Sequence, residues 1–306
     1  YSRASLQQLR REIGIHYDER IRGILHLYTD PQEFEAAKAP AELMRGMGLD
    51  RQLKTPAECV AIEPALAACQ HRLAGGTYAA SDESGDAHMF TQALAQRAAA
   101  KGVDFRYQTR IERIETEGGA ISAIRVARKD GALESVRGDA YVLALGSYSP
   151  LFAKTLGIFL SIYPAKGYSV TMPVKNPRAA WSVSLTDDEH KLVYSRLGER
   201  LRIAGTAELT GYNLDINTLR CEAIVKRTMD LFPDAGNPGK AQYWTGLRPS
   251  TPSNIPYIGR TKYPNLYLNT GHGTLGWTHA CGSGRALADI VSGRRPEVDF
   301  AFTGSG

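Results

Sequence analysis

The sequence contains few cysteines, and their arrangement excludes the usual disulfide and zinc frameworks. No two of them form a C-x-x-C pair, and no cluster with histidine has zinc-binding spacing. We therefore expect no metal site, and separate reduced thiols as in a cytoplasmic protein. The residues are Cys59, Cys69, Cys221 and Cys281.

Long apolar runs and dense basic segments are also absent. No stretch approaches the roughly twenty apolar residues that cross a bilayer. The formal net charge is +5, but the lysines and arginines are spread along the chain rather than clustered with aromatic residues. We therefore predict no nucleic-acid partner. A mild attraction to anionic ligands or to a phospholipid surface is compatible with this charge.

The first residues contain neither an apolar signal core nor an initiator methionine. Residues 1–13 instead have the pattern of an amphipathic helix, with Leu6, Leu9 and Ile13 on one stripe. A chain that opens inside such a pattern is expected to be part of something longer. Its 306 residues still suffice for one large domain or two ordinary ones.

Capping signals and periodicity divide the chain into helices and strands. Asp30 followed by Pro31 is a helix start, and Thr55 with Glu58 forms a capping box. We predict helices over 1–13, 31–45, 56–63, 87–101, 217–231 and 278–292. A β-rich ribbon over 103–146 turns at two glycine-containing pairs, and from Ile162 onward the pattern is antiparallel β. The mixture predicts an α+β fold with α/β character where strand, loop and helix follow one another.

One glycine loop near the end of the chain has the G-x-G-x-x-G spacing of a dinucleotide-binding turn. The segment "LYLNTGHGTLGW" places Gly271, Gly273 and Gly276 between an apolar strand and a helix. Dinucleotide folds normally begin with that turn and carry an acidic residue about twenty positions later. Here the loop is late in the sequence, and the nearest acidic residue, Asp289, falls within the predicted helix. The loop therefore needs another interpretation.

Four motifs in one order supply that interpretation. They are "YPAKGYSVTMPV", "RLRIAGTAEL", "YWTGLRPSTPSNIPYIGR" and the glycine loop with its helix. Together they resemble the FAD-dependent amino-acid oxidoreductases of the D-amino-acid oxidase and glycine oxidase superfamily. Within it, the "GHGTLGW" loop and "DESGD" resemble the bacterial D-amino-acid dehydrogenases. The likeness extends over nearly the whole chain.

The resemblance implies a fold in two parts, one of them incomplete. Members of the superfamily open with a strand, a G-x-G-x-x-G turn and a helix for the FAD pyrophosphate, and this βαβ segment is absent before Tyr1. We expect an incomplete, discontinuous Rossmann-like FAD-side domain from 77–158 and 249–306. An antiparallel-sheet substrate domain is expected from 1–76 and 159–248.

The resemblance also assigns residues to the substrate. Arg248 in "GLRP" corresponds to the arginine that holds the amino-acid carboxylate, a task for which a guanidinium offers two parallel donors. Tyr194 and Tyr168 are candidates for lining the same pocket, and each is equally compatible with a half-buried sheet position. No general base is required, since a neutral amine drives hydride from the α-carbon to the flavin.

For the cofactor, the resemblance implies three contacts. The glycine loop would bring the start of the following helix to the flavin ring, where a partial positive charge stabilises the reduced anion. Ile111 would contact the adenine side through its backbone, and Ala144 with Gly146 would approach the ribityl and pyrophosphate region. The loop residues are Gly271, His272, Gly273, Thr274, Leu275 and Gly276.

The activity implied by the resemblance is oxidative deamination of D-amino acids to 2-oxo acids and ammonia. Electrons would pass from FAD to a quinone or other acceptor. Two alternatives stay open, namely a glycine/sarcosine-type amine oxidase of the same superfamily and a catalytically inactive fragment without flavin. The expected location is cytoplasmic, with a peripheral contact to the inner face of the bacterial plasma membrane as an option. The apolar segment 156–164 is a candidate for that contact or for an interdomain segment.

Overall fold

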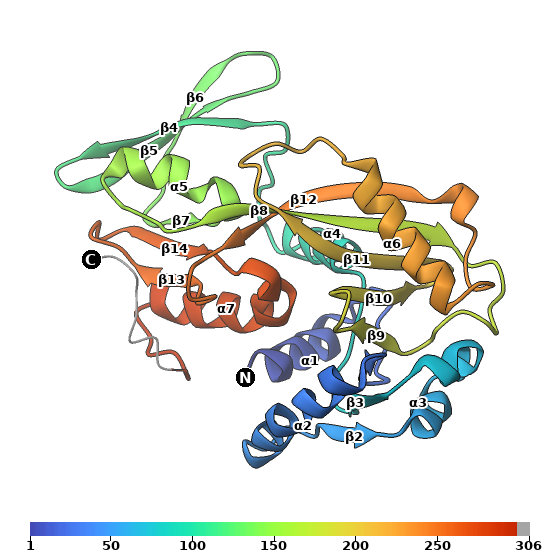
Figure 1. Cartoon of the computed structure of the whole chain (residues 1–306). Helices are drawn as coiled ribbons and strands as arrows, with labels where there is room; N and C mark the ends of the chain where they lie inside the picture. Colours follow the sequence, from blue (N-terminus) through green and yellow to red (C-terminus); the bar gives the residue numbers. More distant parts are fainter. Residues whose placement is uncertain (299–306) are drawn as a thin grey trace.

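The computed structural model describes residues 1–298, in which helices and strands are mixed (Figure 1). The prediction of an α+β fold is confirmed. The helices are α1 (Ser2–Ile13), α2 (Pro31–Gly46), α3 (Pro56–Ile62), α4 (Ala87–Ala99), α5 (Ser149–Ala153), α6 (Thr218–Leu231) and α7 (Gly276–Val291). The end of the predicted FAD-side domain, residues 299–306, lies outside the described residues.

The largest sheet has eight strands in the order β12-β8-β11-β10-β9-β1-β3-β2. Its neighbours are antiparallel except β1 and β9, which are parallel. Its strands are β1 (Ile24–Tyr28), β2 (Gln52–Lys54), β3 (Gly75–Ala79), β8 (Tyr163–Pro173), β9 (Ser184–Asp187), β10 (Leu192–Leu197), β11 (Arg200–Glu208) and β12 (Gln242–Ser250).

One face of this sheet carries the largest hydrophobic core. Tyr168, Val170 and Met172 alternate along β8 toward that face, where they pack with residues of α6 such as Ile224 and Leu231. Alternation along a strand sends intervening residues to the opposite face. The sheet therefore has a covered face under α6 (Figure 1) and a second face that carries different side chains.

Two three-stranded sheets complete the β structure. The ribbon of β4 (Arg110–Glu117), β5 (Ala120–Ala127) and β6 (Leu133–Val136) projects at the upper left of Figure 1. The other sheet has the order β13-β14-β7, from β13 (Tyr257–Arg260), β14 (Leu266–Thr270) and β7 (Tyr141–Leu143). In it, β14 and β7 run parallel although they are far apart in sequence.

Helices α1, α4 and α7 meet in a separate cluster. Leu6 of α1, Phe90 of α4 and Trp277 of α7 pack together there. The Ser2 hydroxyl donates to the carbonyl of Thr278, 2.6 Å away. Helix α1, which the sequence placed with the substrate part, thus packs on the helix that follows the glycine loop.

The capping predictions are confirmed in detail. Asp30 accepts from the amide of Gln32, and Thr55 with Glu58 forms the reciprocal capping box. The structure differs at β7, which is shorter than the predicted apolar strand, and at α5, which the sequence did not predict. Extended structure ends at Leu143, and a 3₁₀ turn over Gly146–Tyr148, which starts at positive φ, leads into α5.

Candidate functional site

The carboxyl ends of β7 and β14 lie at one edge of their sheet because the two strands are parallel neighbours. The Thr270 hydroxyl donates to the carbonyl of Gly146 at 3.1 Å and lies 2.8 Å from the Ser149 hydroxyl. Ligands of open α/β sheets bind outside the carboxyl ends of strands. The predicted cofactor residues Ala144, Gly146 and those of the glycine loop are therefore brought together.

The end of β12 also lies where Ala144, Gly146 and the glycine loop come together. We call this place the meeting point. The Ser147 hydroxyl donates to the carbonyl of Leu247 at 3.0 Å. A Cβ atom built at Gly146 would lie 3.9 Å from Pro249, and one built at Gly273 would lie 3.9 Å from Ser250. The "GLRP" motif on β12 thus adjoins both predicted cofactor loops.

The glycine loop needs glycine at its first position. Gly271 has φ of 81°, and a Cβ atom there would lie 3.0 Å from the Thr251 side chain. Only a residue without a side chain combines that φ with such close packing. Thr274 and Leu275 are exposed at the tip of the loop.

Helix α7 begins directly after the loop, and no side chain caps it. Its first turn contains no acidic residue, so the positive end of the helix dipole is not compensated there. The ring of His272 points to the helix, with its Nε2 3.0 Å from the Ser283 hydroxyl. Burial, followed by the nearby His279, lowers the pKa of His272. A neutral ring held against the helix leaves the loop backbone to face a ligand.

Arg248 lies on the face of the large sheet opposite α6. In the register it pairs with Ala165, and Gly246 pairs with Gly167. A methyl group at Gly167 would overlap the Arg248 guanidinium, which therefore lies over this glycine. The guanidinium donates to the carbonyl of Thr206 at 3.0 Å.

Arg248 pairs with none of the carboxylates among residues 1–298. In the described part of the chain, residues 1–298, no acidic group lies within ion-pair distance of its guanidinium. Burial lowers the pKa of Arg248, and repulsion from Arg202 lowers it further. A partly desolvated cation beside a second cation favours an anionic ligand.

Arg202 and Trp244 share this face of the sheet with Arg248. The Arg202 guanidinium carbon lies 5.9 Å from the centre of the Trp244 ring, which is largely exposed. Arg202 pairs with Thr171 and Trp244 with Ser169, so both project to the same side. We did not identify these two residues from the sequence, and strand pairing was the missing information.

Tyr168 and Tyr194 lie on the other face. Tyr168 and Gly205 are direct partners, as are Tyr194 and Ile203, so both tyrosines project toward α6. Tyr194 is fully buried, and its ring contacts Trp181. The structure therefore does not bring the two tyrosines together with Arg248, and we drop them from the site.

Ile111 lies at the start of the projecting ribbon, where it pairs with Val126. It belongs to neither of the sheets that form the meeting point, and a register shift follows it between Ile111 and Arg113. Its assignment to the adenine side stays a prediction.

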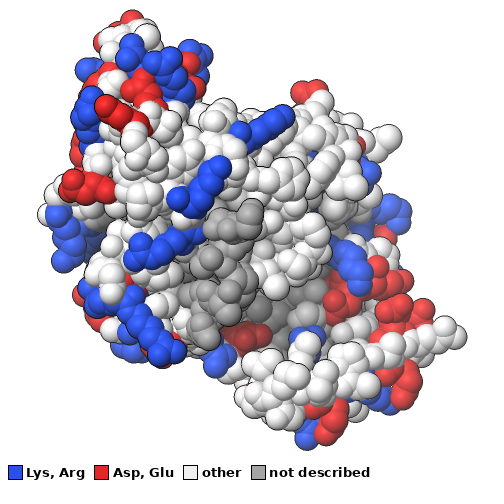
Figure 2. Space-filling view, turned by 90° about the vertical axis from the view of Figure 1, so that its left-hand side faces the viewer, with Lys and Arg blue, Asp and Glu red and all other residues white. Residues whose placement is uncertain are grey.

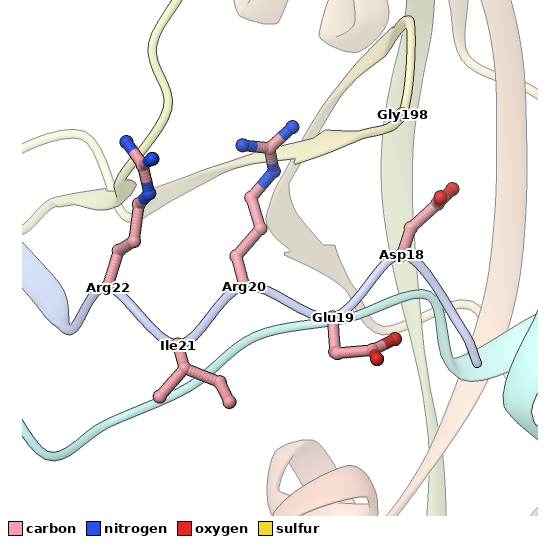
Figure 3. A pocket seen from close by; sticks show the side chains of 6 residues that line it. All are labelled: Asp18, Glu19, Arg20, Ile21, Arg22 and Gly198. Atoms are coloured by element: carbon pink, nitrogen blue, oxygen red, sulfur yellow. The ribbon is translucent and has the colours of Figure 1, made fainter. Parts of the chain in front are cut away.

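A cavity of about 430 Å³ lies elsewhere, at the segment 18–22 and the turn at Gly198. Figure 3 shows Arg20 and Arg22 extending the same way, with Asp18 and Glu19 beside them. Gly198 precedes β11, whereas Thr206 lies near its end. The cavity is therefore at the opposite end of β11 from Arg248, and its mixed charges indicate no single ligand.

One group of side chains has the geometry of metal ligands. Asp187, Glu189 and His190 place ligand atoms within 4.8 Å of one another. Asp187 is already paired with the Nε of Arg227 at 2.7 Å and with His190 at 3.3 Å. The carboxylate of Asp187 is thus already occupied by Arg227, which makes it a poor metal ligand.

The fold and the meeting point define a flavin-dependent oxidoreductase. The chain belongs to the family described as DAO, FAD dependent oxidoreductase, whose model matches residues 1–290. The D-amino acid dehydrogenase of Dechloromonas aromatica (strain RCB) is 57% identical over 302 residues, which cover 99% of this chain and 72% of that protein. That of Paramagnetospirillum magneticum (strain ATCC 700264 / AMB-1) is 56% identical, covering 98% and 70%.

Solved structures share the fold at low identity. Glycine oxidase from Geobacillus kaustophilus has a TM-score of 0.86 at 24% identity, covering 100% of this chain and 81% of that one. L-proline dehydrogenase from P. horikoshii has a TM-score of 0.82 at 19% identity, covering 96% and 78%. The predictions of family, enzyme class and FAD as cofactor are confirmed.

The surface carries both signs of charge. Figure 2 shows lysine and arginine next to aspartate and glutamate over the projecting ribbon, where Arg106 pairs with Glu134 and Arg113 with Glu115. Among residues 1–298, none of the helices combines the length and the apolar character that crossing a bilayer requires.

Proposed function

We propose that the protein catalyses oxidative deamination of D-amino acids to 2-oxo acids and ammonia with FAD as cofactor. The observation that carries this proposal is Arg248 beside the cofactor loops, a partly buried guanidinium that has no acidic partner within the described part of the chain. The relatives named D-amino acid dehydrogenase support the choice of substrate.

The residues at the meeting point fit a flavin. The start of α7 has no side-chain cap, so its first backbone N–H groups are available to a ligand. We propose that the glycine loop faces the flavin ring, that Ala144 and Gly146 adjoin the ribityl and pyrophosphate region, and that Ile111 contacts the adenine side. The bound cofactor supplies the acceptor for the hydride of the α-carbon.

Arg248 orients the substrate in this proposal. Its guanidinium donates one hydrogen bond to Thr206, which leaves further N–H groups for a carboxylate. A carboxylate fixed in two directions presents its α-carbon in one orientation, which lowers the entropic part of the barrier. Trp244 supplies an exposed apolar surface beside Gly246 for the substrate side chain.

We further propose a quinone or other acceptor and a peripheral membrane contact. Most of the apolar segment 156–164 is buried, with Ile158, Leu160 and Ile162 in the core, but Phe159 is 83% exposed. Lys154 and Lys262 are exposed near it, and the Lys262 Nζ donates to the carbonyl of Gly157 at 3.0 Å. An exposed aromatic ring with nearby lysines suits an anionic lipid surface.

We retain the two-part organisation as a proposal, with adjusted boundaries. The boundaries 76/77 and 248/249 fall inside β3 and β12 of the large sheet. Placing them after these strands keeps the sheet whole. Helix α1 goes with the FAD side, since it packs on α7.

The variant Arg248→Ala tests the function. In the flavin-loaded enzyme, kcat/KM for D-alanine should fall about 10- to 100-fold, because a charge-assisted hydrogen-bond pair is lost. Flavin content, measured by the visible absorption band, should not change. The matched control is Tyr194→Phe, which should keep the kinetics because that ring lies under α6.

Three outcomes contradict the proposal. An Arg248→Ala enzyme with unchanged kinetics removes the assigned carboxylate site. Preference of the unaltered enzyme for glycine or sarcosine over D-alanine shows the amine-oxidase alternative. Purified protein that binds no FAD under any condition shows the inactive-fragment alternative.

A further inference from the structure

The strand that holds Arg248 in place contains a β-bulge. In the register of the two strands, Gly205 pairs with Tyr168 and Glu208 pairs with Lys166. Strand β11 thus advances three residues where β8 advances two. Thr206 in the bulge has φ of 56°, a conformation that residues with a side chain rarely adopt. In a regular strand, carbonyls bond to neighbouring strands. Here the Thr206 carbonyl instead accepts from Arg248 at 3.0 Å.

Something must stabilise this conformation, because a β-branched residue is strained at positive φ. Within residues 1–298, the buried Thr206 hydroxyl has no hydrogen-bond partner. It therefore does not contribute. The stabilising contacts lie at the far side of the bulge, on Glu208.

Two hydrogen-bond donors and one more distant cation surround Glu208 on the face of the sheet under α6. Its carboxylate lies 2.8 Å from the Nζ of Lys166 and accepts a hydrogen bond from the Tyr168 hydroxyl. The Nε of Arg220, on α6, is 3.8 Å away. The Lys166 Nζ also donates to the carbonyl of Asp215 at 3.0 Å.

This network is fixed rather than mobile. The Lys166 side chain is 4% exposed and that of Glu208 is 19% exposed. The hydrogen bond from Lys166, followed by that from Tyr168, holds the pKa of Glu208 below its ordinary value. Glu208 is therefore ionised at neutral pH and ties the end of β11 to β8.

We propose that Glu208 is a positioning residue for substrate binding. From the rear face of the sheet, its bonds to Lys166 and Tyr168 hold the bulge, and the bulge presents the Thr206 carbonyl that orients Arg248 on the front face. This inference rests on the proposed role of Arg248. It also gives a role to Tyr168, which lies on the other face from Arg248 and whose hydroxyl donates to Glu208.

The test compares three variants of the flavin-loaded enzyme. Glu208→Gln alone leaves Lys166 buried without its anion and is expected to destabilise the fold. The double variant Lys166→Met/Glu208→Gln removes that penalty together with the ion pair, so that the bulge keeps only the hydrogen bond from Tyr168 and is loosened. The control is Asp187→Asn, which breaks a buried ion pair with Arg227 under the same helix but on β9.

The double variant should raise KM for D-alanine about tenfold, with a much smaller change in kcat, since a misplaced Arg248 binds the carboxylate poorly. The dissociation constant of propionate, a carboxylate without an amine, should rise in parallel when followed by the flavin spectrum. Asp187→Asn should keep both constants while lowering the melting temperature.

Two results overturn the inference. One is a double variant whose KM and propionate affinity match those of the unaltered enzyme. The other is an equal rise in Asp187→Asn, which shows general loosening of the sheet. Failure of the proposed function is distinct, because Arg248→Ala would then leave KM and propionate affinity unchanged.

Discussion

Asp86 joins two parts of the molecule through one carboxylate. Its Oδ1 caps α4 by accepting from the amides of His88 and Met89 at 2.9 and 3.0 Å. Its Oδ2 accepts from Arg200 of β11 at 2.7 Å. Burial on its own raises the pKa of Asp86, but the hydrogen bonds from Met89 and Arg200 outweigh it and the pKa is lowered.

A lowered carboxyl pKa stabilises the fold above the unfolded pKa and loses that effect as the pH falls. The variant Asp86→Asn keeps a capping side chain and removes the charge. It should reduce the free energy of unfolding by about 1 kcal/mol at pH 7, given the half-exposed Arg200. The difference should shrink below about pH 3.9. Urea unfolding of both proteins at pH 7 and in acid measures it, and parallel pH profiles would contradict it.

At the residue scale, the sequence was most informative where one residue type suits one chemical role. Arg248 could be predicted because its motif and its chemistry agree, although its role is still a proposal. The sequence could not assign Tyr168 and Tyr194 to a face of the sheet, because the face that a strand residue occupies depends on the pairing register. The bulge at Thr206 was equally hidden, because it depends on a one-residue mismatch between strands.

At the element scale, the two glycines in the middle of α7, Gly282 and Gly284, differ in their surroundings. A Cβ atom at Gly282 would lie 2.8 Å from the Cβ of Ser2, whereas one at Gly284 would meet nothing within 4 Å. The neighbour of Gly282 is α1, whereas at Gly284 the structure offers no packing reason for glycine.

This pair predicts opposite effects of one substitution. Gly282→Ala should lower the free energy of unfolding by about 1–3 kcal/mol, because backbone of α1 must move. Gly284→Ala should raise it by about 0.5–1 kcal/mol through helix propensity. Chemical denaturation of the two variants is the measurement. Equal effects in either direction would show that the contact of α1 with α7 contributes nothing.

Helices were more predictable than strands for a physical reason. Caps such as Asp30 and Thr55 act within a few residues, so the local sequence contains the whole signal. The sheet order depends on contacts between distant segments, and the hydrophobic periodicity of one segment does not show which other segment it pairs with. The same limit applies to the site, because three loops from separate strands form it.

At the scale of the whole molecule, the exposed Phe159 and the nearby lysines belong to a surface that we propose contacts lipid. Phe159→Ser should reduce co-sedimentation with vesicles that contain anionic phospholipid, and added salt should weaken binding of the unaltered protein. Met47→Ser is the control, since Met47 is a 72% exposed apolar residue at the C-terminal end of α2. Equal binding of all three proteins would refute the contact.

The parallel pairing of β7 with β14 also fixes when the site can form. Thr270 reaches Gly146 across 124 positions of sequence. During synthesis from the amino terminus, β7 leaves the ribosome long before its partner is made. The edge of β7 stays unpaired until β14 has been made, and pairings between distant segments form slowly. The nascent chain is therefore expected to depend on chaperones until its last segment emerges.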